Sequence, residues 1–178
     1  MKRLFAAVIA VWLFSPEAGF AEDLKQPDSI PENLRVPPGN EAILKGLAVG
    51  VQIYDCRPTA NGHAWVFRAP QAALFNGNEQ LIGTHFAGPT WQALDGSRVV
   101  GKMVASNPAP TPQSIPWLLV QAASHEGTGT LSRVTYIQRV LTGGGVAPAT
   151  EGCTAKKVGD EARVEYVAFY YFYVAKSG

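Results

Sequence analysis

Short apolar runs alternate along this chain with turns rich in glycine and proline. Residues 48–54 (AVGVQIY) have a hydrophobic period of two, which is typical of a β-strand. Similar runs follow at 64–68, 81–87, 90–94, 98–105, 117–124, 133–141 and 163–175. Because no amphipathic segment of helical length separates them, about eight short strands predict an all-β fold, either a sandwich or a barrel.

The segments between these runs carry turn signals. Asn61-Gly62 and Asp95-Gly96 suit tight turns, and the second predicts a hairpin over residues 90–100. Residues 41–46 and 71–75 predict isolated helical turns, so the expected fold contains a few of these beside its strands.

The last run, residues 163–175, is apolar or aromatic on both faces of the predicted strand. A strand of that kind is covered on both sides. We therefore expect it to lie in the centre of the fold.

The N-terminus has the three parts of a secretory signal. Lys2 and Arg3 precede an apolar run over residues 4–14, which is broken at 15–17 and followed by small residues at 18–21. The run is too short for a transmembrane helix. We expect residues 1–21 to be a signal peptide, residues 22–39 a proline-rich extended lead-in, and residues 40–178 a single domain. The predicted location is periplasmic or secreted, with membrane contact only during export.

Composition narrows the function classes. The chain is 47% hydrophobic and 16% charged, which is enough apolar material for a substantial core. Its formal net charge is +1, so electrostatic binding of nucleic acid is not expected. The sequence does not indicate an oligomeric state.

Two cysteines, Cys56 and Cys153, lie 97 positions apart in the part that follows the signal. An even number of cysteines in an exported protein favours a disulfide. Closing a loop of this length stabilises a fold by roughly 4 to 5 kcal/mol. Two free thiols or a metal pair are the alternatives, although no histidine lies at ligand spacing.

Several motifs resemble one known family. They are the runs at 50–56 (GVQIYDC), 82–91 (IGTHFAGPTW), 95–97 (DGS), 115–119 (IPWLL), 134–139 (VTYIQR), 143–145 (GGG) and 152–153 (GC). They are similar to domain-of-unknown-function family 3455 of secreted bacterial and fungal proteins. In that family both cysteines recur, which supports pairing Cys56 with Cys153. The resemblance implies no established activity and no catalytic residues.

Some relatives carry a malate dehydrogenase label, which the residues argue against here. A dinucleotide site needs a glycine-rich turn that leads into a helix. The glycines at 143–145 are followed by Val-Ala-Pro without a helical segment. No cofactor is expected.

Acid–base and metal chemistry are weakly indicated. His63, His85 and His125 lie on different predicted elements, so no metal site is expected. His85 lies in the middle of a strand, where it is either a hydrogen-bonded core histidine or a ligand contact. Asp95 is explained by its turn, and Ser97 lacks the Gly-x-Ser-x-Gly setting of a hydrolase.

Polar residues recur in the middle of otherwise apolar strands, with aromatic residues on the same predicted faces. Converging faces of this kind would line a small-ligand pocket, whereas the alternative is the solvent-facing side of a sheet. The candidate ligand-binding residues are Gln52, Tyr54, His85, Trp91, Lys102, Trp117, Gln121 and Gln138.

The leading functional hypothesis is non-enzymatic binding of a small molecule or glycan in such an aromatic and polar pocket. One alternative is an enzyme of unrecognised mechanism that uses His85 and Asp95. The other is a structural envelope or surface protein without a ligand.

Overall fold

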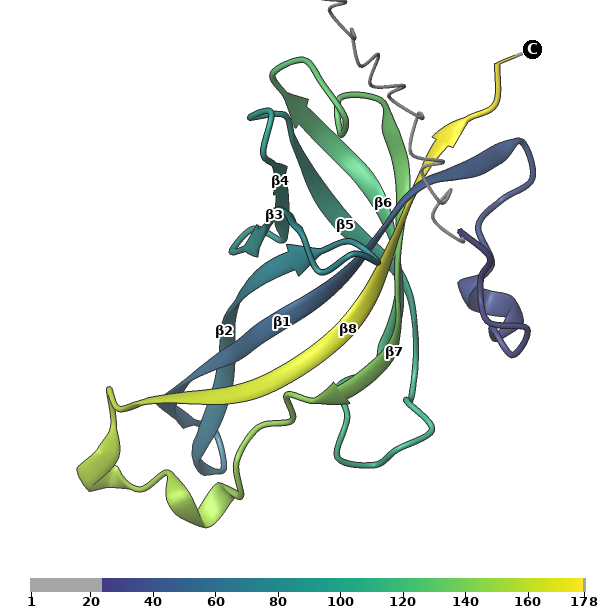
Figure 1. Ribbon diagram of the computed structural model, residues 1–178. Helices are drawn as coiled ribbons and strands as arrows, with labels where there is room; N and C mark the ends of the chain where they lie inside the picture. Colours follow the sequence, from purple (N-terminus) through teal and green to yellow (C-terminus); the bar gives the residue numbers. More distant parts are fainter. Residues whose placement is uncertain (1–23, 178) are drawn as a thin grey trace, which may run out of the picture.

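The computed structural model describes residues 24–177, and the predicted signal peptide lies outside the described residues. Eight antiparallel strands pair in chain order, and pairing of the first with the last closes the sheet into a barrel (Figure 1). The strands are β1 (Asn40–Thr59), β2 (Gly62–Phe75), β3 (Leu81–Phe86), β4 (Thr90–Ala93), β5 (Arg98–Asn107), β6 (Trp117–Glu126), β7 (Val134–Gly144) and β8 (Glu161–Ala175). The all-β prediction is confirmed, and the fold is a barrel.

The helical content consists of three short 3₁₀ turns among the described residues, η1 (Glu32–Leu34), η2 (Thr150–Gly152) and η3 (Ala155–Lys157). The predicted helical turns at 41–46 and 71–75 are wrong, because these residues belong to β1 and β2. Strand pairing satisfies their backbone groups better than an isolated turn would. In the described part of the chain no helix is both long and apolar enough to cross a membrane.

The barrel interior holds the main hydrophobic core. Alternate residues of β8 point inward, and Tyr166, Ala168, Tyr170 and Phe172 are all buried there. Leu74 of β2 and other apolar residues of the remaining strands pack against them. The strand alternation therefore sends one side of each strand into a shared core.

A second core lies on the outer face of the barrel. Ile30 and Leu34 of the N-terminal segment are buried against Trp117 of β6, Val140 of β7 and Tyr171 of β8. Figure 1 shows this segment beside the barrel wall. The segment was expected to be a lead-in outside the core, but its two apolar side chains belong to the folded domain. The prediction that β8 is covered on both faces is confirmed.

The predicted disulfide between Cys56 and Cys153 is present, with a Cα–Cα distance of 5.4 Å. Cys56 lies near the end of β1, and Cys153 follows η2 in the long connection between β7 and β8. The backbone supports the same junction, since the Cys56 N–H donates to the Asp160 carbonyl and the Gly159 N–H donates to the Cys56 carbonyl. The disulfide therefore holds this connection against the barrel.

Candidate ligand-binding site

An aromatic cluster lies inside the barrel around His85. Register places His85 of β3 opposite Trp91 of β4, and their rings stack with centroids 4.3 Å apart. Tyr170 of β8 meets the edges of both rings, at 5.1 Å from His85 and 5.4 Å from Trp91. Gly101 makes room for the indole, because a Cβ there would lie 3.0 Å from the Trp91 ring.

A second group of side chains, Gln52, Tyr54 and Tyr166, meets at Gly145. The Tyr54 hydroxyl donates to the Gly145 carbonyl at 2.6 Å. A Cβ on Gly145 would lie 2.9 Å from Tyr166 Cβ and 3.0 Å from Gln52 Cγ. The backbone at Gly145 has a φ of +83°, which disfavours any other residue. Four of the predicted site residues, Gln52, Tyr54, His85 and Trp91, are therefore buried within the barrel.

Four polar atoms in this interior have no hydrogen-bond partner among the described residues. They are Gln52 Nε2, Trp91 Nε1, Tyr166 Oη and Tyr170 Oη. The two hydroxyls are not isolated, because Tyr166 and Arg139 both lie close enough to the Tyr170 hydroxyl to influence its pKa. Buried polar groups in native proteins are normally paired, and each unpaired one costs about 1 to 3 kcal/mol. These atoms make the interior a candidate site, although Trp65 Nε1 and Trp117 Nε1 outside it lack a partner in the described part of the chain as well.

Arg139 is the functional candidate that the sequence reasoning missed. It lies opposite Tyr170 in the β7–β8 register, and its Nε and Nη2 donate to the Pro116 carbonyl at 3.1 and 2.8 Å. Among the described residues no carboxylate lies within ion-pair distance of it. The available signal was its two-residue spacing from Ile137, which places an arginine on an inward-facing position.

Burial controls the ionisation of this interior. It lowers the pKa of His85 to about 3, while the Thr90 carbonyl, 2.9 Å from Nδ1, acts in the opposite direction. His85 is therefore neutral at pH 7, with Nδ1 donating. Burial raises the pKa of Tyr166 and Tyr170, and the Arg139 guanidinium opposes that rise. The tyrosines therefore stay protonated, and Arg139 provides the positive charge of the cluster.

Two hollows on the outer surface meet across β1 at Gly50. The first, about 440 Å³, includes Tyr166 and Val167, and the second, about 660 Å³, includes His85. They share Val49, Gly50 and Val51. We call the two hollows together the Gly50 groove.

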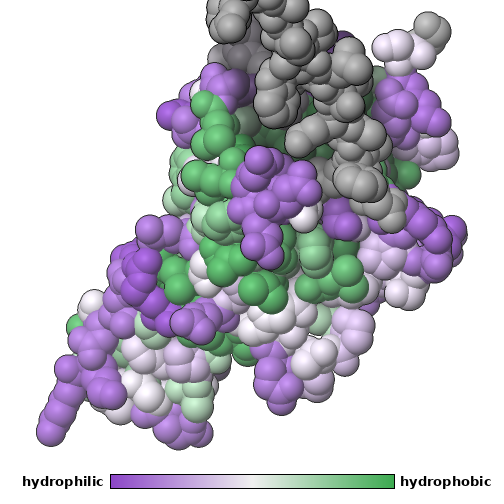
Figure 2. Space-filling view, in the orientation of Figure 1, coloured by the Kyte–Doolittle hydropathy of each residue, from purple (hydrophilic) through white to green (hydrophobic). Residues whose placement is uncertain are grey.

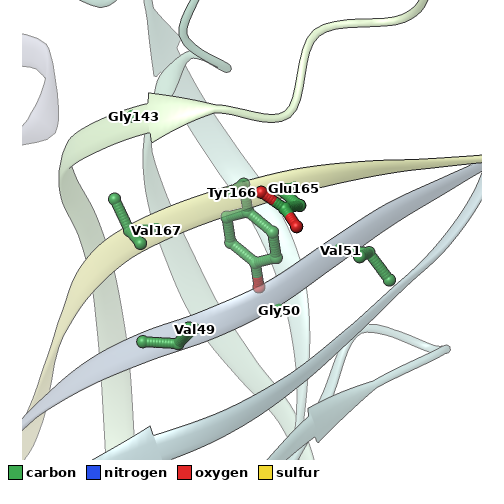
Figure 3. Close-up of a pocket in the computed structure, with 7 residues that line it drawn as sticks. All are labelled: Val49, Gly50, Val51, Gly143, Glu165, Tyr166 and Val167. Atoms are coloured by element: carbon green, nitrogen blue, oxygen red, sulfur yellow. The ribbon is translucent and has the colours of Figure 1, made fainter.

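Tyr166 borders the first hollow, and its ring is buried on the interior side of the wall. In Figure 3 the ring extends from β8 towards β1, and its hydroxyl lies at the level of Gly50, between Val49 and Val51. Hydrophobic side chains gather over the middle of β1 and β8 in Figure 2, and Val49 and Val167 are 45% and 40% exposed. The wall has no side chain at Gly50, where a Cβ would collide with the Gln71 carbonyl oxygen.

The other predicted site residues lie elsewhere, so the expected convergence of all these faces is wrong. Trp117 belongs to the outer core, and Gln138 donates from Nε2 to the Leu34 carbonyl at 2.6 Å. Lys102 and Gln121 are exposed. Bulges in the β5–β6 and β7–β8 pairings interrupt the simple alternation. The N-terminal segment also buries the outward face of β6 and β7, so that burial occurs on both sides of these strands.

Asp95 has a structural position in the turn between β4 and β5. One carboxylate oxygen accepts from the Ser97 N–H and hydroxyl, and the other accepts from the Thr130 N–H and hydroxyl. These hydrogen bonds lower the pKa of Asp95. In residues 24–177 no group of three His, Cys, Asp or Glu side chains is arranged to hold a metal ion.

The chain belongs to the family described as "Protein of unknown function (DUF3455)", whose match covers residues 37–80 and 77–174. This confirms the family resemblance. No curated protein and no solved structure shows significant similarity to the chain.

Proposed function

We propose that this protein binds a small molecule with an apolar body, without covalent chemistry, in the Gly50 groove. The main support is that the two hollows that meet at Gly50 have the size of ligand pockets and share an exposed, partly apolar surface on β1. Val49, Val51 and Val167 supply an apolar lining, with Glu165 at the first hollow and Arg163 at the second as the charged residues beside it. This lining favours a small apolar molecule over a glycan, whose hydroxyls would need many polar partners.

Binding fits the interior better than catalysis does. A general acid or base works best when its pKa lies near the operating pH, whereas the pKa of His85 is about 3. Asp95 is engaged by Ser97 and Thr130. These two residues of the enzyme hypothesis are therefore better explained as parts of the fold.

The disulfide supports a role outside the cytoplasm. Disulfides persist in oxidising compartments, and Cys56–Cys153 is compatible with the periplasm or the extracellular space. We propose that the protein meets its ligand there, after export.

A neutral fluorescent probe tests the Gly50 groove. N-phenylnaphthylamine, which brightens in apolar sites, is titrated into the exported, oxidised protein and into Val49→Asp. Val49 lines both hollows, so a carboxylate there should weaken probe binding by at least about tenfold. Val104→Asp is the matched control, because Val104 on β5 is 48% exposed against 45% for Val49.

The proposal predicts probe binding by the wild type and by Val104→Asp, and its loss in Val49→Asp. Absence of probe binding by the wild type would refute it. Equal weakening by both substitutions would also refute it, since the probe would then be detecting general surface hydrophobicity. Circular dichroism checks that all three proteins are folded.

A further inference from the structure

We propose that the ligand of the Gly50 groove is a long, unbranched aliphatic chain that lies across the strands and occupies both hollows. This inference rests on the proposed function and names the chemical class of its ligand. Its support is a row of paired residues that crosses five neighbouring strands on the outer face of the barrel.

This cross-strand row follows from the strand register. Gly143 of β7 lies opposite Val167 of β8, Val167 opposite Val49 of β1, Val49 opposite Ala73 of β2, and Ala73 opposite Thr84 of β3. Directly opposite residues share one face of a sheet, and Figure 3 shows Val167 between Gly143 and Val49. Gly143 and Val167 line the first hollow, Ala73 and Thr84 line the second, and Val49 lines both. The two hollows are therefore the two halves of one path.

The side chains of the cross-strand row suit an aliphatic chain. Val49 and Val167 present exposed apolar surface in its middle, and Thr84 at the β3 end is its single polar member. At the β7 end, a Cβ on Gly143 would lie 3.0 Å from Val167 Cγ2, so glycine leaves this end of the first hollow open. Covering the valines with CH₂ groups removes apolar surface from water, which is favourable.

The charged residues of the groove lie beside the cross-strand row. Val51 lies opposite both Glu165 and Gln71, and these three residues form the next row along the strands. Arg163, two residues before Glu165, donates to Glu161 and to Gln71. A chain over the cross-strand row therefore passes beside these groups and leaves their hydrogen bonds in place.

The strand spacing gives the length of the ligand. Five strands span four spacings of about 4.8 Å, or about 19 Å, and each hollow spans two of these spacings, or about 10 Å. An extended chain with bonds of about 1.5 Å advances about 1.25 Å per carbon. The whole row therefore accommodates about 15 carbons, and one hollow about eight. Because the sheet curves around the barrel, a flexible chain can follow the row, whereas a rigid ring system fits one hollow.

A series of neutral fluorescent probes measures this length. Nitrobenzoxadiazole-labelled alkylamines, from hexyl to octadecyl, are titrated into the wild type at concentrations below their aggregation, beside N-phenylnaphthylamine. We expect the affinity to rise about twofold per carbon, since an open groove buries one side of the chain. The rise should end in a plateau at about 15 carbons.

A tryptophan at the β3 end of the row tests the path. Thr84→Trp should move the plateau to about 11 carbons, one strand spacing shorter, and leave the affinity of the octyl probe unchanged, because that probe fits the first hollow. Ser124→Trp is the matched control, because Ser124 is also an exposed hydroxyl residue on a strand, in β6. Circular dichroism checks that both variants are folded, and the wild-type plateau tests the inference if Thr84→Trp fails to fold.

The outcomes separate this inference from the proposed function. A plateau at about eight carbons would overturn the long chain, since the ligand would then occupy one hollow, and it would leave the Gly50 groove as a site for compact molecules. A plateau that Thr84→Trp does not shift, or an affinity that still rises at the octadecyl probe, would overturn the path along the row. Failure of N-phenylnaphthylamine to bind would refute the proposed function itself.

Discussion

Two buried glutamines, Gln52 in β1 and Gln138 in β7, lie on opposite sides of the barrel wall. Gln138 is 0% exposed and lies beneath the N-terminal segment. Its Nε2 donates to the Leu34 carbonyl, and its Oε1 accepts a long bond of 3.4 Å from the Tyr173 hydroxyl. Gln52 is 2% exposed inside the barrel, and its Nε2 has no partner in the described structure.

The difference separates a polar residue that serves the fold from one that is available to a ligand. An amide paired on both its atoms is explained by the structure that it holds together. An unpaired buried amide imposes a cost on folding, and such costs concentrate at functional sites. The outer core around Leu34 is therefore the structural region of this molecule, and the interior around Gln52, Tyr166 and Arg139 is its candidate site.

The largest expected effect comes from removing the apolar anchor of the outer core. Leu34→Ala truncates a side chain that is 0% exposed and should lower the free energy of unfolding by about 2–5 kcal/mol. Leu94→Ala is the control, because Leu94 is 67% exposed and its loss should cost less than about 0.5 kcal/mol. Urea denaturation at pH 7 measures both. Equal midpoints would mean that the N-terminal segment contributes nothing to the fold.

Acid should destabilise the interior through His85. The pKa of this residue is about 3 in the folded protein and 6.5 in the unfolded chain, so the unfolded state takes up the proton first as pH falls. Stability should therefore fall between about pH 6.5 and pH 4, by about 3 kcal/mol for this residue. The pKa of Asp95 is also lowered, but its contribution is lost only below about pH 4.

Comparison with His85→Phe isolates that contribution. The phenyl ring can replace the imidazole in the stack on Trp91 and does not titrate. Denaturation midpoints at several pH values should fall less steeply for the variant than for wild type in this window. Parallel curves would show that His85 is not held neutral, and thus that solvent reaches the barrel interior.

A matched pair of glutamine substitutions tests the comparison directly. Gln138→Leu leaves the Leu34 carbonyl and the Tyr173 hydroxyl without their partner and should cost about 1–3 kcal/mol. Gln52→Leu removes an amide nitrogen that has no partner and should change stability by less than about 1 kcal/mol, in either direction. Thermal and urea unfolding give both values. A larger loss at Gln52 would invert the roles assigned to the two sides of the wall.

The sequence predicts the architecture well because the signals for it are local. Alternation, turn residues and the two-sided apolar pattern of residues 163–175 suffice for an all-β fold with a covered last strand. The Cys56–Cys153 disulfide could be predicted because the chain contains two cysteines, which leave a single possible pairing. Four of the candidate residues, Gln52, Tyr54, His85 and Trp91, are buried on the interior side of their strands, and their role in binding stays a prediction.

The other candidate residues do not lie with these four, because burial alone does not say which side of a strand faces inward. On β7 both Ile137 and Gln138 are 0% exposed, one inside the barrel and the other beneath the N-terminal segment. A period of two cannot distinguish these sides once a distant segment covers the outer one. Arg139 was missed for the same reason, because the opposite face of β7 was assigned to the pocket. The packing of Leu34 against the outer face of β7 shows which side of the strand faces outward, and this contact is visible only in the folded structure.

The smallest expected effect concerns single hydroxyl groups on the two sides of β8. Tyr171 faces the outer core, where its hydroxyl donates to the Lys25 carbonyl at 3.1 Å, so Tyr171→Phe should cost about 0.5–1.5 kcal/mol. Tyr166 faces the interior, and its hydroxyl has no partner in the described structure. Tyr166→Phe should therefore be neutral or slightly stabilising. Urea midpoints at pH 7 compare the two. A greater loss at Tyr166 would show that its hydroxyl is satisfied without a ligand, and the interior would then resemble the outer core.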